Sequence, residues 1–258
     1  MHFPVGHWAM VKDLLSAALL TGMACIALVG CASAPDRPGV GVVDGIAARQ
    51  TAALGSTYAA LLTPGGSVFK LDPKNSVVRI YAFRAGKAVT FGHNHVLSAP
   101  EFQGFFYLAP DGTAASRFDL EFRLDQLAFD DPEHRSTLGA AFASTITAEA
   151  TASTRDNMLG DNNFQAARFP RVRIQSVQIV GEAPKFAAKV AVELHGQTRE
   201  MWTALTVKGL PDHLTVDGAL VLLQSDFGVK PLSVLGGLLA VQDEVIVEFR
   251  LAGEKHGF

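Results

Sequence analysis

Apolar and polar residues alternate with a period of two along three stretches of the chain. In residues 117–124 apolar side chains stand at every second position, and charged side chains fill the positions between them. Residues 185–194 and 244–251 repeat the pattern, with small or apolar residues at some intervening positions. Such alternation places one face of a β-strand against a core and the other face in water. The pattern therefore predicts half-buried strands of an antiparallel sheet.

Further strands are predicted elsewhere in the chain. The candidates are Ser76–Arg84, Val89–Val96, Glu101–Leu108, Arg171–Val180, Met201–Val207 and Leu214–Leu223. In Arg171–Val180 the apolar phase slips, and one extra residue near Gln175-Ser176 would restore it, so we predict a β-bulge there. Many antiparallel strands joined by short turns are typical of closed barrels. The chain is thus predicted to be all-β, with an antiparallel barrel of about eight strands.

One stretch has helical character. Ser144–Leu159 contains Ala148, Ala150 and Ala152, which favour a helix, and Gly160 follows as the expected end. We predict one short helix here. It is interpreted as a connector that covers one mouth or flank of the barrel rather than as a functional lid.

The composition narrows the classes of function. Of 258 residues, 18% are charged and the formal net charge is −3, which argues against a nucleic-acid-binding protein with a basic surface. Phenylalanine occurs 17 times against 3 tyrosines and 2 tryptophans, so the barrel interior should be apolar. Barrels of about eight strands are either filled by their own side chains or hold one small ligand. Both outcomes stay open, and an acyl or polyprenyl chain would suit an apolar interior.

The N-terminal sequence indicates where the protein works. Leu14–Gly30 is apolar and leads into Leu28-Val29-Gly30-Cys31, which resembles a bacterial lipobox, where the signal is cleaved and the cysteine is acylated. A transmembrane anchor is the alternative. We predict a lipoprotein signal peptide over residues 1–30, lipidation of Cys31 and attachment to a membrane through that lipid. The expected location is the cell envelope, at the outer membrane facing the periplasm.

The rest of the chain divides into three predicted parts. Residues 31–66 are rich in Ala, Gly and Pro and are predicted to be a flexible linker, with a short helix near Ile46–Leu62. Residues 67–253 should form the barrel, and residues 254–258 a tail. Cys25 would leave with the signal peptide and Cys31 would be acylated, so the mature chain would have no thiol for a disulfide or a zinc site.

A pair of histidines suggests an alternative function. His93 and His95 are two residues apart and share a face if this segment is a strand. With His134, His195 or His213 as a third ligand they could hold zinc or copper, or serve a periplasmic haem-binding protein. No spacing ties a third ligand to the pair. We therefore favour a structural role, in which the pair is hydrogen-bonded to the backbone or to Asp, and predict no metal.

The sequence contains no Ser-His-Asp order with a nucleophile elbow, no phosphate loop and no dinucleotide fingerprint. We therefore predict a binding protein without catalytic residues or a cofactor, and no particular protein partner is indicated. Asp226 is expected to bond backbone N–H groups where a strand turns into a loop. Arg155, Arg168 and Arg199 are candidates for a lipid headgroup, with solvated surface charges as the simpler interpretation.

Three short motifs occur in order on these predicted elements. They are Phe169-Pro170 before a strand, His195-Gly196 between two strands and Asp226-Phe227-Gly228 before an apolar loop. Together they resemble the YceI-like family of polyisoprenoid-binding envelope proteins, over roughly Val68–Ala252. The resemblance implies a lipocalin-like barrel that binds an isoprenoid, a quinone or a similar amphiphilic lipid. His195-Gly196 itself is expected to shape a hairpin turn.

The predicted pocket rests on the alternation and on the assumption that the apolar face points inward. The lipid-binding candidates are Phe118, Phe122, Val190, Val192, Leu205, Leu220, Val247 and Phe249. The apolar loop Lys230–Leu239 contains two adjacent glycines and is predicted to gate the cavity, with a static plug as an equal alternative.

Overall fold

The structure is a computed structural model that describes residues 53–258. The predicted signal peptide, the Cys31 lipidation site and residues 31–52 lie outside the described residues. The strands are β1 (Ser67–Leu71), β2 (Val77–Ala85), β3 (His95–Ser98), β4 (Phe102–Leu108), β5 (Arg117–Arg123), β6 (Ala128–Phe129), β7 (Arg171–Glu182), β8 (Lys185–Leu194), β9 (Gln197–Lys208), β10 (His213–Leu223), β11 (Ser233–Val234) and β12 (Leu239–His256). The helices are α2 (Pro132–Ser136) and α3 (Ala148–Leu159), and residues 53–59 are also helical. Within this described part, no helix has the length and apolar character needed to cross a membrane.

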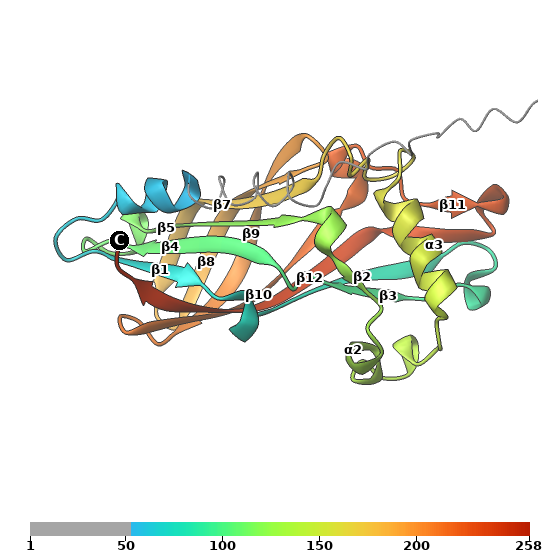
Figure 1. Ribbon diagram of the computed structural model, residues 1–258, viewed down its shortest axis with the longest axis horizontal. Helices are drawn as coiled ribbons and strands as arrows, with labels where there is room; N and C mark the ends of the chain where they lie inside the picture. Colours follow the sequence, from blue (N-terminus) through green and yellow to red (C-terminus); the bar gives the residue numbers. More distant parts are fainter. Residues whose placement is uncertain (1–52) are drawn as a thin grey trace, which may run out of the picture. The chain divides into compact units, whose positions relative to one another are not determined.

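Eight of the strands form a closed antiparallel barrel (Figure 1). Hydrogen-bonded neighbours follow the order β1-β4-β5-β7-β8-β9-β10-β12, and β12 pairs back with β1. At this closing seam Val68 pairs with His256 and Leu71 pairs with Gly253. The arrangement confirms the predicted all-β barrel of about eight strands.

Strand β12 is shared between the barrel and a small side sheet. One of its edges pairs with β10, and the other pairs first with β2 and then with β1. Strand β2 leads on to β3 and β6, so the side sheet branches from the barrel at β12. The predicted end of the barrel at residue 253 is too early, because β12 continues to His256 to complete its pairing with β1.

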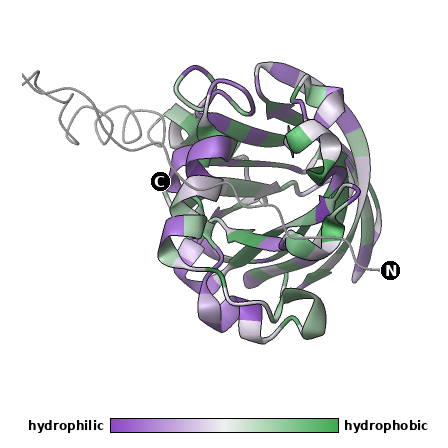
Figure 2. Cartoon of the chain, turned by 90° about the vertical axis from the view of Figure 1, so that its right-hand side faces the viewer, coloured by the Kyte–Doolittle hydropathy of each residue, from purple (hydrophilic) through white to green (hydrophobic). Residues whose placement is uncertain are grey.

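Alternation along each strand decides which side chains face the interior. In β8, Val190, Val192 and Leu194 are buried, whereas Lys185 and Glu193 are exposed. Figure 2 shows hydrophobic and hydrophilic positions alternating along the strands of the barrel wall. The inward side chains join one continuous core, whose burial from water is the main stabilising contribution to the fold.

The predicted β-bulge lies in β7. Ser176 pairs with Val190 and Gln178 pairs with Lys189, so Val177 is an extra residue on the β7 side of the ladder. Val177 is exposed, and Ile179 returns to the core. The slip in the apolar pattern is therefore explained by one unpaired residue.

The predicted strand Val89–Val96 is wrong for most of its length. Val89–Phe91 form a 3-10 turn, η2, and β3 begins only at His95. Asn94 turns the chain, since its side-chain Oδ1 accepts a hydrogen bond of 3.0 Å from the Arg84 backbone N–H. The Arg84 guanidinium in turn donates to the Gly92 carbonyl at 2.9 Å. These local bonds replace the ladder that a strand would need.

Helix α3 forms within the predicted stretch and ends where expected, before Gly160. Its N-terminus is capped by Thr147, whose hydroxyl accepts a hydrogen bond from the Ala150 N–H. Arg155 fastens the helix to the barrel, because its guanidinium donates to the carbonyls of Leu127 and Asp125. Arg155 is thus a structural residue, which differs both from the solvated surface charge favoured from the sequence and from a lipid-headgroup contact.

The short helix predicted near Ile46–Leu62 is present at residues 53–59 of the described part, and it packs against the barrel. Tyr58, in the helical residues 53–59, is fully buried and stacks on Phe105 with ring centroids 5.3 Å apart. Its hydroxyl donates a 2.8 Å hydrogen bond to Asp119. Burial and the Asp119 carboxylate together raise the pKa of Tyr58 above its ordinary value. The segment therefore packs against the outside of the barrel instead of forming a free tether.

Candidate functional site

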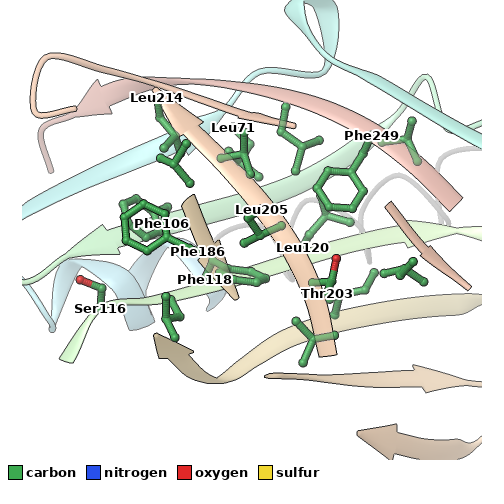
Figure 3. A pocket seen from close by; sticks show the side chains of 18 of the residues that line it. Leu71, Phe106, Ser116, Phe118, Leu120, Phe186, Thr203, Leu205, Leu214 and Phe249 are labelled. Carbon is green, nitrogen blue, oxygen red and sulfur yellow. The ribbon is translucent and has the colours of Figure 1, made fainter. Parts of the chain in front are cut away.

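The barrel encloses an apolar cavity (Figure 3). Seven of the eight predicted pocket residues line it, namely Phe118, Phe122, Val190, Leu205, Leu220, Val247 and Phe249. The eighth, Val192, is buried in the same core but does not line the cavity. All eight side chains face the interior of the barrel, as the sequence pattern predicted. Only the position of Val192 along β8 differs, because it lies beyond the end of the cavity.

The lining of the cavity favours hydrocarbon over polar groups. Among the described residues that line it, the only polar side chains are Thr113, Ser116 and Thr203. The Thr203 hydroxyl donates to the Ala219 carbonyl at 3.0 Å, and the Ser116 hydroxyl donates to the Gly112 carbonyl at 3.1 Å. These two donors are therefore already used within the protein. A bound group in this space meets methyl groups and aromatic rings.

The cavity reaches only one end of the barrel. Thr113 comes from the turn between β4 and β5, and Leu210 from the turn between β9 and β10, so the cavity extends to the end where these turns lie. At the opposite end, Phe227, Val229 and Leu124 are buried and fill the interior. The shape is that of a cup with a packed base.

The cavity volume is about 120 Å³. An apolar cavity of about 150 Å³ is large enough to hold benzene, so this space is narrow. Figure 3 shows Phe106, Phe118 and Phe186 directed into it. A longer ligand would therefore have to turn these rings aside.

The three sequence motifs meet at the packed base. His195 and Gly196 both have positive φ angles, of 52° and 70°, and join β8 to β9 as a two-residue turn, which confirms the predicted hairpin. The His195 Nδ1–H donates to the Phe227 carbonyl at 3.0 Å, and the ring meets Phe169 edge-on at 4.8 Å. A Cβ at Gly196 would lie 2.7 Å from the Phe169 ring, so only glycine fits. The motifs therefore build the base of the cup, away from the cavity lining.

Asp226 does not have the predicted role. It is exposed, and the carboxylate that accepts the backbone N–H at this turn belongs to Asp243, which is 2.8 Å from the Ser225 nitrogen. The turn itself ends at Gly228, whose φ of 71° lies in the left-handed region. Asp243 could not be recognised from the sequence, because it comes from the start of the next long strand.

Neither remaining arginine candidate lies at the cavity. Arg168 stacks over the Phe169 ring, 4.9 Å from its centroid. Arg199 donates to the carbonyl of its neighbour Thr198 at 2.8 Å on the exposed part of β9. Both side chains act locally, so the simpler interpretation of solvated surface charges fits them better than a headgroup site.

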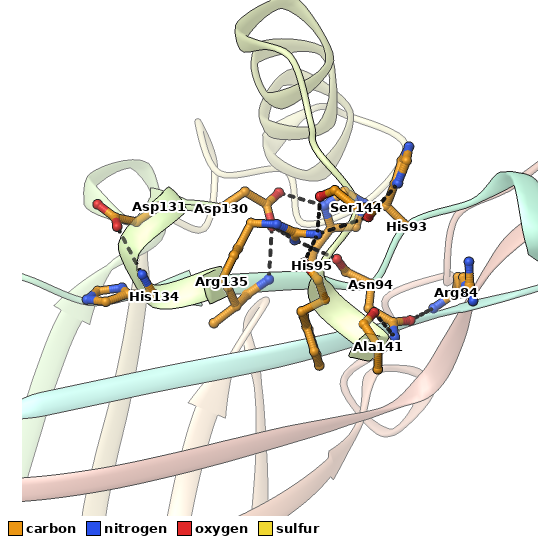
Figure 4. A network of polar contacts seen from close by, with 12 residues as sticks. Arg84, His93, Asn94, His95, Asp130, Asp131, His134, Arg135, Ala141 and Ser144 are labelled. Atoms are coloured by element: carbon orange, nitrogen blue, oxygen red, sulfur yellow. Dashed lines mark hydrogen bonds and ion pairs between the residues drawn. The ribbon is translucent and has the colours of Figure 1, made fainter. Parts of the chain in front are cut away.

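A buried polar network surrounds the histidine pair (Figure 4). The Asp130 carboxylate accepts 2.7 Å hydrogen bonds from His95 Nδ1 and from Arg135 Nη1, and its side chain is completely buried. Burial alone would raise the pKa of Asp130. Three neighbours outweigh burial and hold the pKa of Asp130 below its ordinary value. They are His95, through its hydrogen bond and charge, the Val96 N–H, through its hydrogen bond, and Arg135, through its charge. The network fixes the loop that follows β6.

The two histidines point to different partners. His93 precedes β3, and its Nδ1 lies 3.0 Å from the Ser144 hydroxyl, whereas His95 bonds Asp130. They do not share a strand face, because β3 begins at His95. Within residues 53–258, no three or more His, Cys, Asp or Glu side chains are grouped to hold a metal ion. The metal- or haem-binding alternative therefore lacks support from the geometry.

Sequence reasoning missed the central members of this network, Asp130 and Arg135. Their only local signal is Asp131-Pro132, which predicts the start of a helix, and Asp131 does cap α2. Nothing in that signal indicates that the neighbouring carboxylate is buried. The loop Lys230–Leu239, predicted to be a gate or a static plug, contributes no residue to the cavity lining.

The family model described as the YceI-like domain matches residues 69–252. The crystal structure of BcnA from Burkholderia cenocepacia aligns over 70% of this chain and 98% of that chain, with 17% identity and a TM-score of 0.51. A YceI protein from Campylobacter jejuni aligns over 63% of this chain and 85% of that chain, with 8% identity and a TM-score of 0.45. No curated protein sequence matches the chain. At such low identities the structural likeness concerns the fold alone.

Proposed function

The chain belongs to the YceI-like domain family, and we propose that its barrel binds the hydrocarbon chain of an isoprenoid or a similar amphiphilic lipid, quinones included. The observation that carries the proposal is the apolar cavity, which extends to one end of the barrel and is closed by a packed base at the other. A cup of this kind accepts a tail and leaves the polar headgroup of the lipid outside. No chemical step is required of the lining residues.

The narrow cavity limits how the lipid binds. Burying each methylene contributes about 0.8 kcal/mol, so ten methylenes would contribute about 8 kcal/mol before ordering costs. Because the cavity volume is about 120 Å³, the rings of Phe106, Phe118 and Phe186 must rotate to admit a chain of that length. Binding is thus expected to be coupled to rearrangement of phenylalanine side chains.

Filling the cavity tests the proposal. Leu205 stands at the centre of the cavity wall, and Leu205→Phe would place additional atoms into the empty space. Excluding about two methylenes of ligand removes about 1.6 kcal/mol, so affinity should fall by about tenfold or more. Fluorescence titration with a labelled polyprenyl analogue measures the dissociation constant. The cost in stability should stay below the roughly 1–3 kcal/mol of overpacking a filled core.

Val221→Phe provides the matched control. Val221 follows the lining residue Leu220 on β10, but its own side chain is 59% exposed on the outer face. This control should bind the analogue as tightly as the parent. If Leu205→Phe also retains the parent affinity while circular dichroism shows an intact barrel, the cavity is not the binding site.

We also propose that Cys31 carries a lipid anchor that places the barrel at the outer membrane, facing the periplasm. The proposal rests on the lipobox-like sequence Leu28-Val29-Gly30-Cys31. In a bacterial host supplied with labelled palmitate, the parent chain should incorporate the label and Cys31→Ser should incorporate none. Cys25→Ser is the control and should remain labelled, because residue 25 lies in the predicted signal peptide. Label retained in Cys31→Ser would exclude lipidation at this residue.

A further inference from the structure

Exposed apolar side chains gather at the end of the molecule that carries β11. Of the fourteen exposed large hydrophobic residues in the described part of the chain, six lie in two short segments there. These six form what we call the apolar tip: Val89, Phe91, Leu232, Val234, Leu235 and Leu238. Phe91 is 79% exposed and Leu235 is 72% exposed. Single exposed apolar residues are common, but such a concentration marks an interaction surface.

The two segments of the tip are joined by backbone hydrogen bonds. The Lys87 N–H donates to the Gly237 carbonyl at 3.2 Å, and the Ala88 N–H donates to the Leu238 carbonyl at 2.8 Å. Gly86 permits this approach, since a Cβ there would lie 2.5 Å from the Leu238 carbonyl oxygen. Figure 1 shows the loop after β2 beside the β11 segment. The tip is therefore one built surface made from two distant parts of the sequence.

Leu235 has an unfavourable backbone conformation although its side chain points into solvent. Its φ angle is 52°, in the left-handed region that residues other than glycine seldom occupy. Burial of the side chain does not offset the unfavourable conformation, because the side chain remains largely in solvent. The backbone thus presents an apolar side chain in a conformation that glycine, asparagine or aspartate adopts more readily.

The charged side chains within the two segments of the tip are basic. Residues 84–94 and 228–241 include Arg84, Lys87 and Lys230 but no Asp or Glu, although the whole chain carries a formal net charge of −3. Apolar side chains flanked by basic ones match a bilayer surface with anionic headgroups. Two copies of the tip would instead bring like charges together, which disfavours self-association through this surface.

We propose that the apolar tip docks on an anionic phospholipid bilayer, with Phe91 and Leu235 entering the interface and the basic side chains near the phosphates. This inference goes beyond lipid binding in the cavity, because no tip residue lines that space. It also differs from the lipid anchor, which would hold the chain at residue 31. The loop Lys230–Leu239 is thereby assigned to membrane contact rather than to gating.

A fluorophore placed on the tip tests the docking directly. Thr90→Cys, in a full-length chain with Cys25 and Cys31 replaced by serine, carries a nitrobenzoxadiazole label beside Phe91. Ala114→Cys places the same label on the turn between β4 and β5, at the opposite end of the barrel. With vesicles of phosphatidylglycerol and phosphatidylcholine, only the Thr90 label should shift its emission to the blue and be quenched by spin-labelled lipid. Attachment through residues 14–30 would tether both labels alike, so their difference isolates the tip.

Replacing the tip residues should abolish the signal. Phe91→Ser with Leu235→Ser is expected to remove the blue shift and the quenching of the Thr90 label, so that it matches the Ala114 label. Val177→Ser with Val221→Ser removes two exposed apolar side chains elsewhere and should change nothing. A Thr90 label that stays as solvent-exposed as the Ala114 label on anionic vesicles would overturn the proposal. A blue shift that depends on protein concentration without vesicles would also overturn it, in favour of self-association.

Discussion

Phe227→Ala is expected to lower the free energy of unfolding by about 3–5 kcal/mol, the usual cost of removing a fully buried phenylalanine. The Phe227 side chain is 0% exposed and lies in the packed base of the cup, and its carbonyl holds His195 in the hairpin turn. Removing the ring leaves a cavity that the surrounding elements cannot fill by moving closer together. Urea denaturation followed by circular dichroism measures the change.

Phe91→Ala is the matched control for this variant. It removes the same ring from a position that is 79% exposed, so the free energy of unfolding should change by less than about 0.5 kcal/mol. A loss below about 1 kcal/mol for Phe227→Ala would mean that the base is loosely packed, contrary to its burial.

Asp130→Asn is expected to destabilise the fold by about 3–5 kcal/mol, because it leaves Arg135 as a buried charge without its partner. Asp131→Asn makes the same chemical change one residue later on an exposed cap, where asparagine also caps well, and should cost little. Adding Arg135→Met to Asp130→Asn should restore part of the loss, since neither buried charge then remains. No recovery in the double variant would show that Arg135 stabilises through its bonds to Asn94 and Phe142 instead.

The ion pair between Asp130 and Arg135 predicts how the stability of the fold depends on pH. The pKa of Asp130 is lowered in the folded state, so its contribution to stability is fully present above the ordinary Asp pKa of about 3.9. That contribution is lost as the pH falls through the lower folded value. The difference in unfolding free energy between the parent and Asp130→Asn should therefore narrow below about pH 4. A constant difference down to acid denaturation would contradict the assignment.

The barrel was predictable because its signal is local. Alternation in residues 117–124 and 185–194 fixes which side chains face inward without any knowledge of the neighbouring strands. For this reason the sequence identified seven lining residues and the bulge beside Ser176. The prediction for Val192 was wrong only in its position along the strand. Alternation shows which side chains face the interior, but it does not show how far the cavity extends along the barrel.

The features missed by the sequence depend on contacts between distant segments. Tyr58 is buried only because Phe105 and Asp119 lie on strands that meet it, and nothing near Tyr58 in the chain indicates them. The predicted start of strand β3 was too early, because the alternation of apolar residues gives no sign of the turn that Asn94 makes with Arg84. The apolar loop after Gly228 was recognised as unusual, but its partner segment near Phe91 becomes apparent only in three dimensions.

The shared strand β12 has a consequence for the order in which the chain folds. Strands β10, β2 and β1 all pair with it, so none of them can complete its ladder until residues 239–256 have left the ribosome. Until then these strands have unpaired edges, so closure of the barrel is expected to be a late and slow step of folding.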